Sequence, residues 1–62
     1  GMSFKDKYGR EIHVGDTVKT EINVYEVEYD KEKKAYLLYP ANRKYFVYLA
    51  GFTPNVLEVI DK

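Results

Sequence analysis

The spacing of apolar residues along this chain has a period of two, which predicts short β-strands. The clearest case is residues 24–29, where Tyr25, Val27 and Tyr29 alternate with two glutamates. Successive side chains of a strand point to opposite faces, so one face of this strand is predicted to be apolar and the other acidic. No apolar repeat of about 3.6 residues extends far enough for a helix of ten or more residues. The sequence therefore predicts an essentially all-β protein.

Other segments of extended character surround this strand. They are residues 17–20, 35–39, 44–49 and 56–60. The apolar positions change phase near Val24, which predicts a bulge or short loop at residues 21–24. Residues 30–34 form a charge run that suits a hairpin loop. The strands at 35–39 and 44–49 are apolar on both faces, as in a tightly curved sheet or one that gives a face to a partner.

Two glycine-centred turns lie close together before these strands. Asp6 and Gly9 occupy the first and last positions of a four-residue stretch that suits a type I turn followed by a left-handed residue. Gly15 and Asp16 supply a second reversal. An Asp side chain in such a turn can accept hydrogen bonds from backbone amides. We therefore interpret these four residues as structural turn residues.

Five or six short antiparallel strands in a chain of 62 residues are too few for a sandwich of two full sheets. A curled sheet that closes into a small barrel would hide the edge strands. Thr53 and Pro54 suit the N-cap and first position of a 3₁₀ turn at residues 53–55, before the last strand. That turn favours an SH3-like barrel over an OB-fold, which usually needs more residues. We expect a single domain over residues 1–62.

The segment from Asp6 to Val18 resembles a known family. Its sequence, DKYGREIHVGDTV, matches the D-x-x-G-[KR]-x-I-x-x-G-D-x-V segment of YopX-type proteins of phages and prophages. The resemblance is weaker through residues 25–29. Those proteins usually end in a strand that carries a Gly-Asn pair, and residues 59–62 lack it. The resemblance implies an SH3-like, all-β domain with no established activity.

Composition limits how such a domain can be stabilised and where it can act. A chain of 62 residues buries only about 60% of the surface that it exposes when unfolded. It contains no Cys and a single His, so neither disulfides nor a zinc cluster is expected to add stability. The lack of Cys fits a reducing cytoplasm. No apolar run is long enough to cross a bilayer, so no membrane role is expected.

The start of the chain is set apart from the fold. Gly1 precedes Met2, which we interpret as an expression-tag scar, and we expect residues 1–3 to be disordered. These residues show neither the charge nor the apolar run of a signal peptide.

The residues that could carry out chemistry are few. His13 alternates with apolar neighbours on the polar phase of a short strand, and a zinc site would need three or four ligands. Ser3 is the only serine and belongs to the start of the chain. Glu26 and Glu28 share one strand face, where carboxylates usually meet Lys or Arg of a neighbouring strand. We therefore expect no enzymatic activity and no metal or cofactor.

One group of residues has the composition of a binding surface. It consists of Tyr36, Tyr39, Arg43, Lys44, Tyr45 and Tyr48, with Lys33 and Lys34 at the other end of the hairpin. Tyrosine is enriched at protein interfaces, so a partner protein or a second copy of the chain is the leading interpretation.

Rings interleaved with cations can also stack bases, and the alternative is a nucleic-acid-binding barrel that uses the hairpin of residues 33–48. Ten basic residues balance ten acidic ones, so nucleic acid would meet only a local basic patch. Proline-rich peptides are disfavoured because their aromatic groove in signalling SH3 domains requires a Trp, which the chain lacks.

Overall fold

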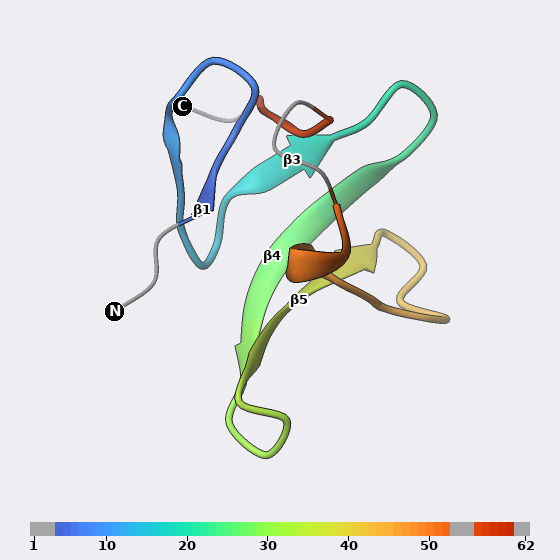
Figure 1. Ribbon diagram of the computed structural model, residues 1–62. Coiled ribbons are helices and arrows are strands. Elements are labelled where there is room, and N and C mark those ends of the chain that lie inside the picture. The colour runs from blue at the N-terminus through green and yellow to red at the C-terminus, as the bar shows by residue number, and fades with distance from the viewer. Residues whose placement is uncertain (1–3, 53–55, 61–62) are drawn as a thin grey trace.

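The computed structural model describes residues 4–52 and 56–60 of the chain, which form two antiparallel sheets (Figure 1). β1 (Phe4–Lys5) and β2 (Glu11–Ile12) pair as a small hairpin. The larger sheet has the strand order β6-β5-β4-β3-β7. Its strands are β3 (Thr17–Lys19), β4 (Val24–Asp30), β5 (Ala35–Pro40), β6 (Val47–Tyr48) and β7 (Glu58–Val59). The predicted all-β fold is therefore confirmed.

A 3₁₀ turn, η1 (Leu49–Gly51), lies between β6 and β7. The sequence predicts such a turn before the last strand, and this part of the prediction is confirmed. It occurs directly after β6, however, whereas the residues predicted to form it, 53–55, lie outside the described residues, as do residues 1–3. The predicted strand at 44–49 is also shortened to β6, because Arg43 has a φ of 54° and residues 41–46 form a loop.

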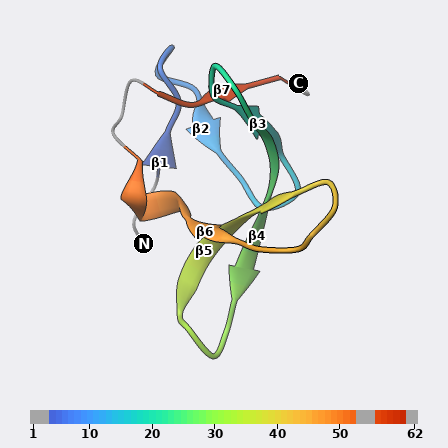
Figure 2. The ribbon, with the colours of Figure 1, turned by 90° about the vertical axis from the view of Figure 1, so that its right-hand side faces the viewer.

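The β4–β5 hairpin is the largest element and extends away from the N-terminal hairpin (Figure 2). Its register pairs Tyr25 with Pro40 and Val27 with Leu38, so these four side chains share a face. The opposite face carries Glu26 and its neighbours in alternate positions. The face assignment predicted for residues 24–29 is therefore confirmed, as is the loop predicted before β4.

The hydrophobic core lies against one face of this sheet. Its buried members are Ile12, Val18, Tyr25, Val27, Leu38, Leu49, Leu57 and Val59. They come from both sheets, from η1 and from the segment that leads into β7. Phe4, Tyr36, Val47 and Phe52 pack against them and are half-buried. Burial of such side chains stabilises a fold by about 1.5–3 kcal/mol each, so this cluster supplies most of the driving force for folding.

The predicted barrel does not close among the described residues. β6 and β7 are the two edges of the larger sheet and are not paired with each other. The free edge of β7 is covered by the first turn of the chain instead. The Val59 N–H donates to Asp6 Oδ2 at 3.0 Å, and Arg10 Nη2 donates to the Val59 carbonyl at 2.8 Å. Lys7 N–H also donates to the Leu57 carbonyl.

Asp6 is the centre of this turn and is 4% exposed. Its Oδ1 accepts the backbone N–H groups of Tyr8 and Arg10, each at 2.9 Å, and the Arg10 guanidinium donates to Oδ2. Burial raises the pKa of Asp6, but the N–H groups of Val59, Arg10 and Tyr8, with the Arg10 side chain, outweigh it and lower the pKa from 3.8 to about 2. Gly9 completes the turn with a φ of 82°.

The second turn has a similar construction. Asp16 Oδ2 accepts the His13 N–H at 2.8 Å, and the Asp16 N–H donates to the His13 carbonyl. Gly15, with a φ of 93°, donates its N–H to the Val27 carbonyl of β4. The structure thus places Asp6, Gly9, Gly15 and Asp16 in turns.

Candidate functional site

A cluster of aromatic rings lies on the face of the larger sheet that points away from the core. We call it the outer aromatic face, and it consists of Tyr39, Phe46 and Tyr48. The Phe46 ring centroid lies 6.0 Å from that of Tyr39 and 5.8 Å from that of Tyr48. Phe46 remains 38% exposed and Tyr48 46% exposed. Edge-on and tilted contacts of this kind hold the rings together while leaving their outer surfaces open.

Leu37 lies beneath this cluster. It is directly opposite Tyr48 in the β5–β6 register and therefore shares the outer face. Leu37 is only 1% exposed, although it is not part of the main core cluster. The two apolar faces predicted for residues 35–39 are thus both used, since Leu38 enters the core and Leu37 is buried on the outer face. The aromatic rings serve partly as a cover for Leu37.

Charged residues surround the outer aromatic face in pairs. Arg43 Nη1 lies 2.6 Å from Glu28 Oε2 and 4.0 Å from Glu26 Oε1, and its guanidinium carbon lies 4.1 Å from the Tyr39 ring centroid. The hydrogen bond from Arg43 lowers the pKa of Glu28, and the same bond raises the pKa of Arg43. The two glutamates of β4 therefore meet a basic residue, as the sequence analysis expects, although it comes from the 41–46 loop.

A second cation borders the face on its other side. Lys33 Nζ lies 5.3 Å from the Phe46 ring centroid and 3.8 Å from Asp30 Oδ2. An apolar centre with a rim of charged groups is the usual anatomy of a protein interface.

The remaining residues of the predicted binding group lie elsewhere. Tyr36 is on the core face, where its ring packs against Phe4 and Tyr29 at centroid distances of 5.8 and 5.0 Å. Tyr45 contacts buried Tyr25, whose pKa is raised by burial and by its hydrogen bond with Tyr45. Lys44 is exposed, and its backbone N–H donates to Asn42 Oδ1. The structure therefore divides the predicted group between two faces.

Phe46 is the central ring of the outer aromatic face and is absent from the binding group predicted from the sequence. A usable signal was present, because Phe46 and Tyr48 are two residues apart in an extended segment and so point to the same side.

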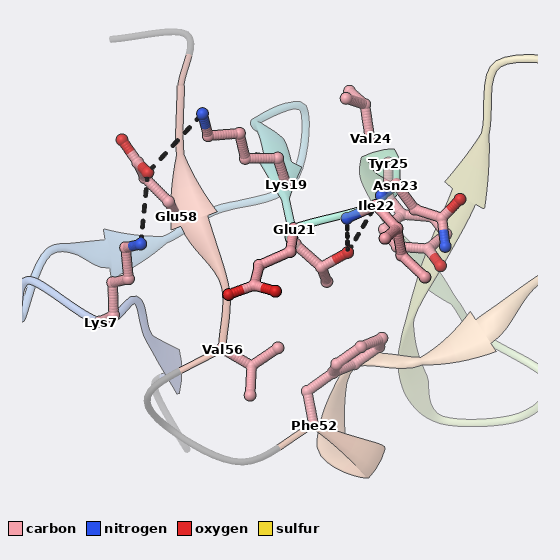
Figure 3. Close-up of a pocket in the computed structure, with 11 residues that line it drawn as sticks. Lys7, Lys19, Glu21, Ile22, Asn23, Val24, Tyr25, Phe52, Val56 and Glu58 are labelled. Carbon is pink, nitrogen blue, oxygen red and sulfur yellow. Dashed lines mark hydrogen bonds and ion pairs between the residues drawn. The ribbon is translucent and has the colours of Figure 1, made fainter.

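A second surface feature is a groove of about 770 Å³ at the start of β4 (Figure 3). It lies between the loop of residues 20–23 and the segments around Phe52 and β7. Its apolar lining includes Ile22, Val24, Tyr25, Phe52 and Val56, and its charged lining includes Lys7, Lys19, Glu21 and Glu58. Ile22 stands at the tip of the loop and is 86% exposed. An apolar residue inside a short polar loop was the sequence signal for this groove.

His13, the only histidine, lies in the second turn. Its Nε2 is 3.3 Å from Glu11 Oε2, and its Nδ1 is 4.0 Å from Asp16 Oδ2. Within residues 4–52 and 56–60, no group of three or more His, Cys, Asp or Glu side chains is arranged to hold a metal ion. A search of the same residues for a helix of the length and apolarity needed to span a bilayer finds none.

The fold and the candidate site define a small all-β domain with an aromatic patch on its outer sheet face. Comparisons with protein-family models, with curated proteins and with solved structures gave no match to the chain. The resemblance of residues 6–18 to YopX-type proteins therefore stays a prediction that rests on those residues.

Proposed function

We propose that this domain is a non-enzymatic, cytoplasmic interaction module of phage or prophage type, and that it binds a partner protein through the outer aromatic face. The observation that carries the proposal is the exposure of Phe46, at the end of the 41–46 loop, and of Tyr48, in β6, inside a rim of paired charges. Rigid aromatic side chains lose little conformational entropy on binding and dominate the affinity of many interfaces.

The charges near the face favour a protein over a nucleic acid. Arg43 is engaged by Glu28 and Glu26, and Lys33 is within ion-pair distance of Asp30. Phosphate binding would have to displace these carboxylates or bring phosphates close to them. A nucleic-acid interface needs uncompensated basic groups that release counterions on binding.

A photo-crosslinking amino acid placed at Tyr48, in the chain produced in its source cells, tests this proposal. We expect a specific protein adduct from position 48 and none from the same group at Tyr8, which is 66% exposed in the first turn. The purified adduct protein should then bind the unmodified domain directly. Tyr48→Ser should weaken that binding about tenfold or more, as expected for an aromatic residue at the centre of an interface.

The nucleic-acid alternative predicts a different result. Labelled single-stranded and duplex oligonucleotides should bind tightly at low salt and weakly at moderate salt, and the double variant Arg43→Ala, Lys44→Ala should lose this binding. That outcome, without a protein adduct from position 48, would overturn the proposal.

A further inference from the structure

We propose that the groove beside the 20–23 loop binds the same loop of a second copy of this chain, which gives a two-fold symmetric dimer. The groove and Ile22 are separate from the outer aromatic face, since none of Tyr39, Phe46 and Tyr48 lines the groove. The inference therefore does not depend on the proposed function.

The apolar lining of the groove suits an aliphatic side chain. Its walls carry Val24, Phe52 and Val56, and Val24 and Val56 are 52% and 38% exposed. At its rim, Ile22 projects with 86% of its surface exposed (Figure 3). Burial of this side chain in an apolar site of another molecule would remove its surface from water, which is favourable. A second copy offers such a site.

The pair of lysines in the groove suits a carboxylate next to that aliphatic side chain. Lys7 Nζ and Lys19 Nζ both approach Glu58 Oε1, at 3.6 and 3.9 Å. Two positive charges against one negative charge leave this trio with an excess of one positive charge. In the described part of the chain, Glu21 has no ion-pair partner. Glu21 and Ile22 of a second copy would therefore bring a carboxylate to the two lysines and an aliphatic side chain to the apolar wall.

Because the 20–23 loop lies beside its own groove, a two-fold axis is the symmetry expected for the dimer. When the protruding residue and the receiving site adjoin on one face, a two-fold axis lets each copy insert Ile22 into the other and closes the assembly. Glu21 of each copy then lies near Lys7 and Lys19 of its partner. The groove as a whole contains two lysines and two glutamates, so the two copies do not repel each other through net charge.

Sedimentation equilibrium over about 10 µM to about 1 mM, the range of a small and weak interface, tests the dimer. We expect the average mass of the unmodified chain to rise from 7.3 kDa towards twice that value. Ile22→Ser should raise the dissociation constant about a hundredfold or more, because two buried isoleucines are lost per dimer. The matched control is Val14→Ser, since Val14 is 57% exposed and does not line the groove.

Charge-reversal variants test the dimer in a second way. A general loss of folding stability would not produce the pattern of dissociation constants expected from them. Glu21→Lys and Lys19→Glu should each weaken the dimer, and the double variant should restore it. Circular dichroism checks that each variant is folded.

A mass of one chain at every concentration would overturn the inference. A dimer that tolerates Ile22→Ser but is abolished by Tyr48→Ser would also overturn it and place the contact on the outer aromatic face. The crosslinking result at position 48 is independent of either outcome.

Discussion

Among single residues, Asp6 has a particular structural role: with Arg10 it forms the hydrogen bonds to Val59 that a neighbouring strand would otherwise form. Its carboxylate and the Arg10 guanidinium bind the N–H and carbonyl of Val59, which are the groups that β7 presents at its free edge. Unpaired edge groups cost free energy when buried and invite pairing with other chains when exposed. The ion pair between buried Asp6 and partly exposed Arg10 therefore completes the sheet edge without an additional strand.

This arrangement predicts an acid-sensitive contribution to stability. The folded pKa of Asp6, about 2, lies below its usual value of 3.8, so the contribution is complete above pH 4 and is lost as the pH falls towards 2. Asp6→Asn should lower the free energy of unfolding at neutral pH and flatten its dependence on pH between 4 and 2. Urea denaturation at a series of pH values measures both effects.

The control for Asp6 is Asp30→Asn. Asp30 also caps a turn, by accepting the Lys33 N–H, but it does so in the exposed loop between β4 and β5. We expect this variant to retain the slope between pH 4 and 2. If both variants had the same pH profile, the role assigned to Asp6 would be wrong.

At the scale of elements, the β4–β5–β6 unit decides which predicted residues can act together. The period of two shows that residues 35–39 have two apolar faces, but it cannot say which face meets the core. The register settles this point, because Val27 lies opposite Leu38 and Glu28 lies opposite Leu37. Tyr36 is consequently on the core face, and the rings of Tyr39 and Tyr48 are on the outer face.

The same unit predicts a measurable coupling between the 41–46 loop and β4. The hydrogen bond from Arg43 lowers the pKa of Glu28, so Arg43→Ala should raise the Glu28 pKa towards its usual range. Carbon-detected NMR titration of the side-chain carboxyls measures this shift directly. Lys44→Ala is the matched control, since Lys44 is an adjacent exposed cation without an ion pair to Glu28 among the described residues. Its Glu28 titration should match that of the unmodified chain.

At the scale of the whole molecule, a chain this short depends on every buried residue. Folded domains are stable by about 5–15 kcal/mol, and small ones lie at the lower end of this range. The main core is built around one sheet face, and Leu37 is buried on the other face. The loss of buried side chains on either face should therefore lower the stability of the entire fold.

Substitution of the two leucines of β5 compares how much buried side chains on each sheet face contribute to the free energy of unfolding. Leu38→Ala should lower the free energy of unfolding by about 2–5 kcal/mol, because it leaves a cavity in the main core. Leu37→Ala should cost less, because the surface loop that carries Phe46 can settle into the space. Urea denaturation of both variants, with equal m-values as a check on two-state behaviour, measures the difference. An equal or larger loss for Leu37→Ala would contradict this account of the outer face.

The local features of this protein follow from its amino-acid sequence. The period of two, the Asp and Gly residues of the two turns and the charge run at residues 30–34 fixed the all-β class and the β4–β5 hairpin, because strand pleat and turn geometry depend on neighbouring residues. Composition likewise indicated that the hairpin carries aromatic residues suited to binding. Composition could not show which of those residues lie on the core face of the sheet and which lie on the outer face.

The long-range contacts can be seen only in the tertiary structure. Asp6 and Val59 are separated by most of the chain, and no local pattern could reveal that this turn covers the edge of β7 and leaves the sheet open. The loop of Ile22 and the segment of Val56 likewise meet only in the folded chain. Such contacts depend on how the strands pack in three dimensions, and this packing places the outer aromatic face and the groove on separate parts of the surface.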